Sequence, residues 1–167
     1  MTQAARIGVS LDGERHTPQV HLIDARLAGL DEEGLRAASR EQAARSGAAF
    51  TSRSYRFPLA LIACHEAPVG VDIERIEPCD EAFGDSISTP AERAARPQRL
   101  ERDRFFISLW SSKEALSKAL GDALAYDPRR LEGPGSWPQG RSGSWRAAAL
   151  EVGPGHLAWL CWRSTDA

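Results

Sequence analysis

Lysine is nearly absent from this chain of 167 residues. Lys113 and Lys118 are the only two lysines beside nineteen arginines, and both lie in the segment LWSSKEALSKALG, residues 109–121. An Ala- and Arg-rich composition is typical of a high-GC genome, which by itself depletes lysine. The two remaining lysines are therefore candidates for a role that arginine does not fill.

The chain also lacks a basic excess, a framework of cysteines and a long apolar run. A net charge of −2 and a pI near 6.1 argue against a protein that binds nucleic acid. Cys64, Cys79 and Cys161 are odd in number and widely spaced, which predicts free thiols in a reducing cytoplasm. No run approaches the ~18 apolar residues of a membrane span, and the first residues contain no apolar core of signal-peptide length. We therefore expect a cytoplasmic protein with no membrane or nucleic-acid partner.

The order of predicted elements indicates an α+β fold. We expect short strands at residues 6–11 and 19–27, a helix at 31–45 and buried strands at 57–64 and 69–76. Helices between residues 89 and 124 and a hairpin at 144–164 follow. A chain of this length forms one compact domain or two small halves that share a core. A break near residue 66 divides it into two similar halves, 1–66 and 67–167.

Two acidic residues lie in the predicted strand VGVDIERI, residues 69–76. Because side chains alternate along a strand, Asp72 and Glu74 point to the face opposite the apolar residues, together with Gly70. Two carboxylates on one strand face lie about 7 Å apart, close enough to hold one cation jointly. The alternative interpretation is a strand with one solvated polar face.

The helix that contains WSSKEALSK carries a third carboxylate. Its predicted core face consists of Phe105, Leu109, Leu116, Leu120 and Ala123. Trp110, Glu114 and Lys118 recur at i, i+4 and i+8 on the opposite face. An exposed Glu–Lys pair is the alternative, but the tryptophan indicates that this face meets a second layer or a ligand. Three carboxylates and two lysines fit a magnesium–phosphate site, because magnesium prefers oxygen ligands and the ammonium is a compact point charge.

GVDIE followed by WSSKEALSK resembles the signature of the 4'-phosphopantetheinyl transferase superfamily, and the tryptophan before SSKEA is similar to its surfactin-synthetase-type branch. The resemblance implies magnesium-dependent transfer of 4'-phosphopantetheine from coenzyme A to a serine of an apo acyl or peptidyl carrier protein, with release of 3',5'-ADP. It also implies a monomer of two pseudo-symmetric halves, each a small antiparallel sheet packed with helix, with coenzyme A between them. Polyketide or nonribosomal peptide synthesis is the expected context.

In this resemblance the magnesium ligands are Asp72, Glu74 and Glu114, and the residues of catalysis are Glu114 and Lys118. Lys113 and Lys118 match the two lysines of the motif, and both are expected to bind coenzyme A, with Lys118 on its phosphates. The carboxylates and Lys118 are thus expected to form one site.

The segment FTSRSY, residues 50–55, is similar to a family segment in which Ser-His-Ser holds the 3'-phosphate of coenzyme A. Ser54 matches a serine of this segment, and Arg53 replaces the histidine. Since a guanidinium binds phosphate bidentately, Arg53 and Ser54 are further expected cofactor-binding residues. The alternative is an edge strand or a turn with outward polar side chains.

Two features keep other interpretations open. The N-terminal half is shorter than in surfactin-type relatives, and EQAARSGAAF, residues 41–50, leaves no room for their Gly-Lys-Pro segment. A degenerate, non-catalytic member that binds carrier protein or coenzyme A is the first alternative, and a plain structural domain is the second. Glu92 matches a family glutamate that has been linked to catalysis, but Thr89, Pro90 and Glu92 also form a helix capping box.

Overall fold

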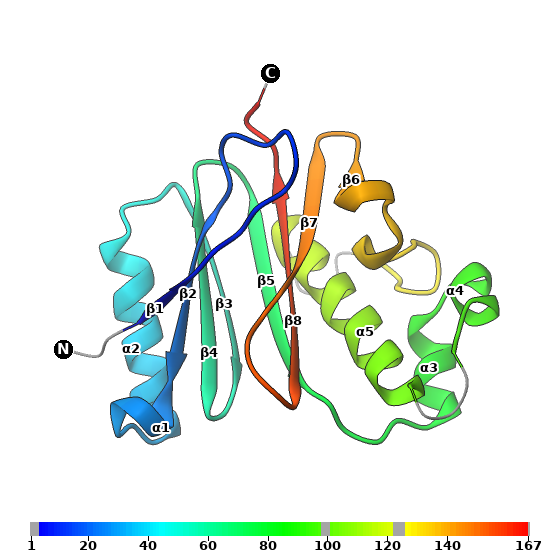
Figure 1. The fold of residues 1–167 in the computed structure, drawn as a ribbon, viewed down its shortest axis with the longest axis horizontal. Coiled ribbons are helices and arrows are strands. Elements are labelled where there is room, and N and C mark those ends of the chain that lie inside the picture. The colour runs from blue at the N-terminus through cyan, green and yellow to red at the C-terminus, as the bar shows by residue number, and fades with distance from the viewer. Residues whose placement is uncertain (1–3, 98–100, 122–125, 167) are drawn as a thin grey trace.

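The computed structural model describes residues 4–97, 101–121 and 126–166 and confirms an α+β fold with two four-stranded antiparallel sheets (Figure 1). Sheet A has the order β1 (Ala5–Ile7), β2 (Gln19–Asp24), β4 (Leu59–His65), β3 (Phe50–Arg56). Sheet B has the order β5 (Val69–Arg75), β8 (His156–Arg163), β7 (Trp145–Leu150), β6 (Arg141–Ser142). The helices are α1 (Ala25–Ala28), α2 (Glu32–Arg45), α3 (Glu81–Ile87), α4 (Pro90–Ala94) and α5 (Arg102–Ala119), with 3-10 turns η1 (Pro134–Ser136) and η2 (Pro138–Gly140).

Apolar side chains of the two sheets share one core, and the other face of each sheet carries a helix (Figure 1). Alternate residues of β4 and β5, among them Leu61 and Val71, lie in the shared core. The opposite residues of β4 pack with Leu35 of α2. Leu116 of α5 packs with Cys161 of β8. The alternation of β5 therefore turns Asp72 and Glu74 toward the α5 side, as the sequence predicts.

Strands β3 and β5 are edge strands of their own sheets, and they contact each other where the sheets meet. The Ser52 hydroxyl accepts a hydrogen bond from the backbone N–H of Val71 at 3.1 Å, and the Ser54 hydroxyl accepts one from Ile73 at 3.2 Å. Side-chain oxygens thus satisfy two edge N–H groups that would otherwise lack partners in a buried seam.

The loop between β1 and β2 ties the N-terminal part of the chain to sheet B. Glu14 accepts hydrogen bonds from Arg146 of β7 and, at 2.7 Å, from the Ser164 hydroxyl. The backbone N–H of Arg15 donates to Asp166 at 2.7 Å. The strands of sheet A precede residue 66 and those of sheet B follow it, but these contacts cross between them. Division into halves 1–66 and 67–167 stays a prediction.

Helix capping explains where several predictions hold and where one fails. Helix α2 begins after Asp31, whose side chain accepts from the Gly34 N–H, as the prediction of a helix at 31–45 requires. The prediction that residues 25–27 continue a strand is wrong. Asp24 accepts from the Arg26 N–H and starts α1 instead, and Gly29 ends this helix with a φ of 64°.

The predicted core face of α5 is only partly correct. Leu109 and Leu116 are buried and Phe105 is partly buried, but Leu120 is 45% exposed, and Ala123 lies outside the described residues. The helix contacts β5 and β8 on one side and α3 and η1 on others, so polar residues such as Lys113 are buried as well. A single apolar stripe does not describe a helix packed on several sides.

The three cysteines are free thiols, as predicted. Within the described ranges, the helices include none with the length and apolar character needed to cross a membrane.

Candidate functional site

A glycine brings α5 unusually close to β5. A Cβ atom added at Gly70 would lie 2.0 Å from the Ala115 carbonyl oxygen and 2.5 Å from the Ala119 N atom. Any side chain at position 70 would push the helix off the strand. The close approach places Lys118 beside Asp72, two residues further along β5.

Asp72 is a buried carboxylate with one oxygen bound and one free. Its Oδ1 atom accepts hydrogen bonds from the Ser54 hydroxyl at 2.9 Å and the Lys118 ammonium at 2.8 Å. The Lys118 ammonium also donates to the Val71 carbonyl at 3.2 Å. The Oδ2 atom is buried and has no hydrogen-bond partner among the described residues. Since buried polar atoms are normally bonded, this oxygen is a candidate ligand position.

Glu74 and Glu114 complete a group of three interacting carboxylates. Burial and the nearby charge of Asp72 raise the pKa of Glu74, against the Arg56 guanidinium 2.6 Å away and a hydrogen bond with Trp110. Burial and the charge of Asp72 also raise the pKa of Glu114, while Lys118 opposes this shift. The raised pKa values of Glu74 and Glu114 indicate that their carboxylates and that of Asp72 are close enough to repel one another. A bound cation would relieve this repulsion.

The donor chemistry of these residues fits a hard divalent cation, because all three side chains offer carboxylate oxygens and Asp72 has one oxygen without a partner. In the part of the chain that the structure describes, no group of three or more His, Cys, Asp or Glu side chains converges closely enough to hold a metal ion. Lys118 binds Asp72 and Arg56 binds Glu74. A cation would compete with these two groups for the same oxygens.

The structure does not bring Lys113 to this carboxylate group. The Lys113 ammonium donates to the Ile87 carbonyl at 2.7 Å, to Glu92 at 2.6 Å and to the Pro128 carbonyl at 2.5 Å. Its side chain is 2% exposed. The three donors of an ammonium thus meet three acceptors inside the protein. This arrangement differs from the expected contact with coenzyme A.

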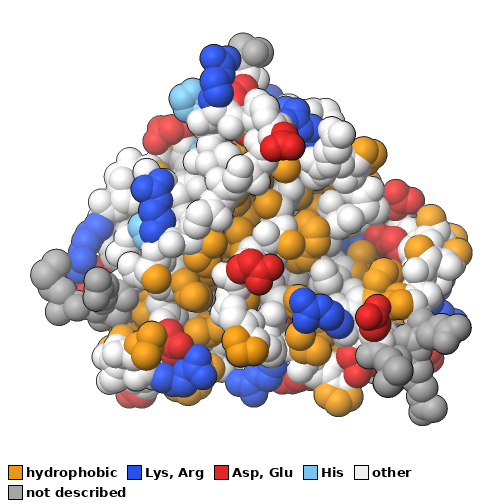
Figure 2. All heavy atoms as spheres, viewed as in Figure 1, with side chains coloured by type: hydrophobic (Ala, Val, Ile, Leu, Met, Phe, Trp, Pro, Cys, Tyr) orange, Lys and Arg blue, Asp and Glu red, His pale blue; other side chains and the backbone are white. Residues whose placement is uncertain are grey.

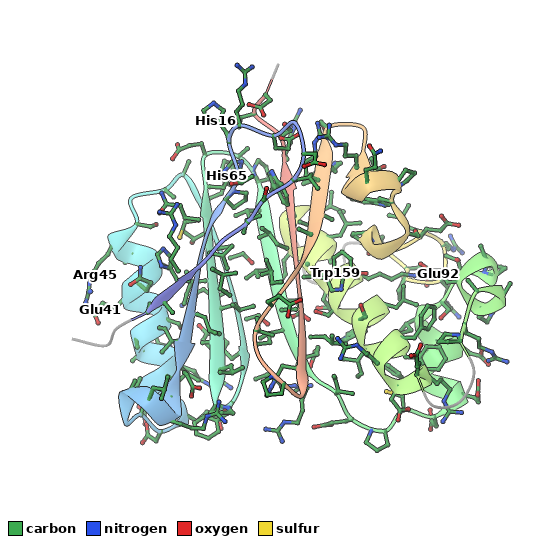
Figure 3. All side chains as sticks on the ribbon, viewed as in Figure 1. His16, Glu41, Arg45, His65, Glu92 and Trp159 are labelled. Atoms are coloured by element: carbon green, nitrogen blue, oxygen red, sulfur yellow. The ribbon has the colours of Figure 1, made fainter. Side chains whose placement is uncertain are left out.

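Glu92 forms the capping box that the sequence predicts, and it also holds Lys113. The Glu92 carboxylate accepts from the Thr89 N–H at 2.8 Å, and the Thr89 hydroxyl accepts from the Glu92 N–H. Its other oxygen accepts from the Gly133 N–H at 2.7 Å. Glu92 lies on α4 facing α5 (Figure 3). Burial lowers the pKa of Lys113, and Glu92 opposes this shift.

Of the two expected residues of β3, the structure brings only Ser54 to the carboxylates. Arg53 lines a cavity of about 440 Å³ with Arg40 of α2 and Thr51. Within the described ranges, no carboxylate lies within ion-pair distance of the guanidinium of Arg53 or Arg40. Because neighbouring strand residues point to opposite faces, the side chains of Arg53 and Ser54 lie on opposite faces of β3.

A second cavity, of about 630 Å³, adjoins the carboxylate group. Its wall includes Arg56, Glu74, Phe83, Ile107 and Trp110. The rings of Phe83 and Trp110 meet edge to face with centroids 6.1 Å apart. The sequence interpretation missed α3, Phe83 and Arg56. The signal for α3 is Asp80, which caps the helix through the Phe83 N–H.

Comparisons with known proteins match part of this chain. Residues 68–146 match the family model described as the 4'-phosphopantetheinyl transferase superfamily. A protein of Bacillus pumilus named "4'-phosphopantetheinyl transferase psf-1" is 38% identical over 74 residues, which cover 38% of this chain and 28% of that protein. The chain thus matches less than a third of the length of this relative. Within the matched residues, the resemblance seen in GVDIE and WSSKEALSK is confirmed.

Proposed function

We propose, on the premise that residues 68–146 are a 4'-phosphopantetheinyl transferase superfamily segment, that the chain is a transferase of this kind. It transfers 4'-phosphopantetheine from coenzyme A to a serine of an apo acyl or peptidyl carrier protein and releases 3',5'-ADP. The observation that carries the proposal is the buried Asp72 carboxylate, which binds the ammonium of Lys118 through one oxygen and has no partner for the other among the described residues.

In the proposed reaction, the carrier serine oxygen forms a bond to the phosphorus that carries pantetheine. The bond from this phosphorus to the bridging oxygen breaks, and 3',5'-ADP leaves with the electron pair. The serine proton requires an acceptor. Burial and the charge of Asp72 raise the pKa of Glu114, which makes its carboxylate a stronger base than an ordinary glutamate. Glu114 is therefore the proposed proton acceptor.

Lys118 supplies positive charge beside the reacting phosphates. Its ammonium holds Asp72 and the Val71 carbonyl, and its side chain is 25% exposed. It therefore reaches both the buried carboxylate and incoming ligand. Phosphoryl transfer depends mainly on positioning and on neutralisation of charge, for which a compact ammonium is suited.

Asp72, Glu74 and Glu114 are the proposed magnesium ligands, and their side chains would have to move closer together to hold the ion, because in the described residues they do not converge closely enough. Bound magnesium supplies neutralisation of the negative charge on the phosphate oxygens. Ser54 holds one Asp72 oxygen in place through its hydroxyl group. Trp110 and Arg56 do the same for Glu74.

The two cavities suggest places for the rest of coenzyme A. The 630 Å³ cavity joins Glu74 to the apolar side chains of Phe83, Ile107 and Trp110, and this lining suits the pantetheine arm. The cavity of Arg53 and Arg40 suits a phosphate, since neither guanidinium has a carboxylate partner within the described ranges. Arg53 binding to the 3'-phosphate stays a prediction.

The test is incubation with coenzyme A, magnesium and several apo carrier proteins, followed by intact mass of the carrier. Transfer adds one phosphopantetheine group to the carrier. The alternative, a non-catalytic member that binds coenzyme A or carrier protein, predicts calorimetric binding without this change in mass. The monomeric state, the cytoplasmic location and the biosynthetic pathway stay predictions.

A further inference from the structure

A cavity of about 360 Å³ lies at one end of sheet A, away from the carboxylates. His65, at the end of β4, lines this cavity and pairs with Phe50 of β3. Ser54, which binds Asp72, pairs with Leu61, four residues earlier on β4. Four residues of a strand span about 13 Å. The cavity therefore belongs to a different part of the molecule from Asp72.

His65 has a buried ring nitrogen without a partner. The residue is 7% exposed, and its Nε2 atom forms no hydrogen bond within the described part of the chain. His65 lines the cavity and lies near His16 at the same end of the molecule (Figure 3). Leaving a buried polar atom without a hydrogen bond costs about 1–3 kcal/mol, so such an atom calls for a partner. A ligand in the cavity is one way to supply it.

The same cavity gathers positive charge. Arg6, Arg15 and His16 line it together with His65, and basic, histidine and acidic side chains lie together at this end of the molecule (Figure 2). In residues 4–97, 101–121 and 126–166, no carboxylate lies within 4.0 Å of the guanidinium of Arg6 or Arg15. The lining contains one acidic side chain, Glu66.

Two further acids, besides Glu66, lie close to these basic groups. Asp166 lies 3.9 Å from the His16 ring and accepts a hydrogen bond from the Arg15 backbone. Glu14 contributes to the field at His65, but its own carboxylate is bound by Arg146 and Ser164. Arg6 and Arg15 both line the cavity, and neither has a carboxylate within ion-pair distance in the described residues.

We propose that this cavity is a binding site for a dianionic oxyanion, namely phosphate or the phosphate of a phosphomonoester. Guanidinium groups bind such oxyanions through paired N–H donors, and an imidazole N–H adds a further donor. The site shares no residue with the carboxylate group or with the cavity of Arg53, except for Ala48, which lines both cavities. It goes beyond the proposed transferase reaction.

An anion at this site changes the protonation of His65. Burial lowers the pKa of His65 and His16 lowers it further, whereas the Arg163 backbone, Glu66 and Glu14 raise it. The imidazole is thus mostly neutral at pH 7. A bound dianion favours the protonated ring, so binding raises the pKa of His65 and strengthens as the pH falls.

The test is NMR of the histidine rings of the full chain between pH 5 and 8, with sodium sulfate as the probe and without coenzyme A, magnesium or carrier. Sulfate keeps its double charge over this range, so any pH dependence comes from the protein. We expect sulfate to raise the pKa of His65 and to leave that of His156 unchanged. His156 begins β8 beside Arg75, at the far end of sheet B.

Arg15→Gln is the decisive variant, because Arg15 is exposed and its substitution should leave the fold intact. Sulfate affinity should fall at least about tenfold, the scale of one charged hydrogen bond. Arg75→Gln is the matched control and should bind sulfate as the wild type does. Inorganic phosphate and glycerol phosphate, compared at one pH, distinguish the free ion from a monoester.

Three results overturn the proposal. In the first, the pKa of His65 does not respond to sulfate or phosphate. In the second, the response of Arg15→Gln equals that of the wild type. In the third, a separate titration with coenzyme A shifts the pKa of His65 while the simple anions do not, which would assign the cavity to coenzyme A. Because neither transfer nor magnesium enters the measurement, its outcome is independent of the proposed reaction.

Discussion

The ammonium of Lys113 lies 2.6 Å from the carboxylate of Glu92, and these side chains are only 2% and 6% exposed. Five residues later, Lys118 reaches Asp72 at 2.8 Å with a side chain that is 25% exposed. The two lysines of this chain therefore have different roles. Lys113 joins α5 to α4 and to the segment of Pro128 and Gly133, whereas Lys118 belongs to the proposed reaction site.

Loss of Lys113 should destabilise the fold. Lys113→Met leaves the Glu92 carboxylate buried without its cation, which costs about 3–5 kcal/mol of unfolding free energy. Lys113→Arg should also destabilise, because a planar guanidinium does not fit three acceptors placed around one ammonium. Urea denaturation measures the unfolding free energy of both variants.

The double variant Lys113→Met/Glu92→Gln tests whether the pair is the cause. Removing both charges should cost less than the sum of the two single changes. If Lys113→Met unfolds at the wild-type urea concentration, the buried ion pair does not stabilise the protein. This expectation differs from that of the sequence alone, which places Lys113 in the coenzyme A site.

Lys118→Arg should impair turnover without affecting stability. A guanidinium is wider than an ammonium and directs its donors differently, while Asp72 and the Val71 carbonyl fix the space at this position. We expect at least about a tenfold loss of turnover, or about 1.4 kcal/mol of transition-state stabilisation. Steady-state kinetics and a thermal melt measure the two effects. Normal turnover would remove Lys118 from the reacting site.

Glu114→Gln should be inactive and yet at least as stable as the wild type. Burial and repulsion from Asp72 raise the pKa of Glu114, so its ionised form weakens the fold at pH 7. The neutral amide removes this repulsion but cannot accept the serine proton. Thermal melts and transfer assays are made on the same sample. Wild-type transfer by Glu114→Gln would contradict the assignment of Glu114.

Ser54→Ala and Ser52→Ala form a matched pair of variants. Each loses one hydrogen bond from β5 to β3, which is worth about 1 kcal/mol of stability. Only Ser54 also donates to Asp72. Ser54→Ala should therefore alter magnesium-dependent activity, while Ser52→Ala changes stability alone. Equal activity of the two variants would show that the Ser54–Asp72 bond does not position the carboxylate.

Glu14 should make stability depend on acidic pH. Burial raises its pKa, but hydrogen bonds from Arg146 and Ser164 outweigh this effect and leave the pKa below the ordinary value of 4.5. A depressed pKa contributes stability above pH 4.5 that is lost as the pH falls through the folded-state value. Glu14→Gln should be less stable at pH 7 and lose less stability on acidification. An unchanged slope of stability against pH below 4.5 would contradict this.

Local patterns predicted much of the fold. The alternation of VGVDIERI correctly turns Asp72 and Glu74 away from the shared core, and the capping box correctly begins α4 at Thr89. These features depend on neighbouring residues, so the sequence contains them directly. The i, i+4, i+8 spacing likewise placed Trp110, Glu114 and Lys118 on one face of α5, where Trp110 lines a cavity with Glu74 and Lys118 binds Asp72.

The sequence patterns did not predict contacts between segments that are distant in the chain. Lys113 lies on a helix that the sequence predicts, but its partners Ile87 and Pro128 come from other segments. The direction of the Arg53 side chain follows from the alternation of β3. The sequence alone did not decide it, because FTSRSY fits both a strand and a turn. Arg56 and Phe83 enter the site through tertiary packing alone.

The most direct test of the account is the intact mass of apo carrier proteins after incubation with coenzyme A, magnesium and either the wild type or Glu114→Gln. The account predicts that the wild type adds one phosphopantetheine group to a carrier serine, that a chelator abolishes the change, and that Glu114→Gln leaves the carrier unmodified. The contradicting result is an unmodified mass for every acyl and peptidyl carrier in reactions where a known 4'-phosphopantetheinyl transferase modifies the same carriers.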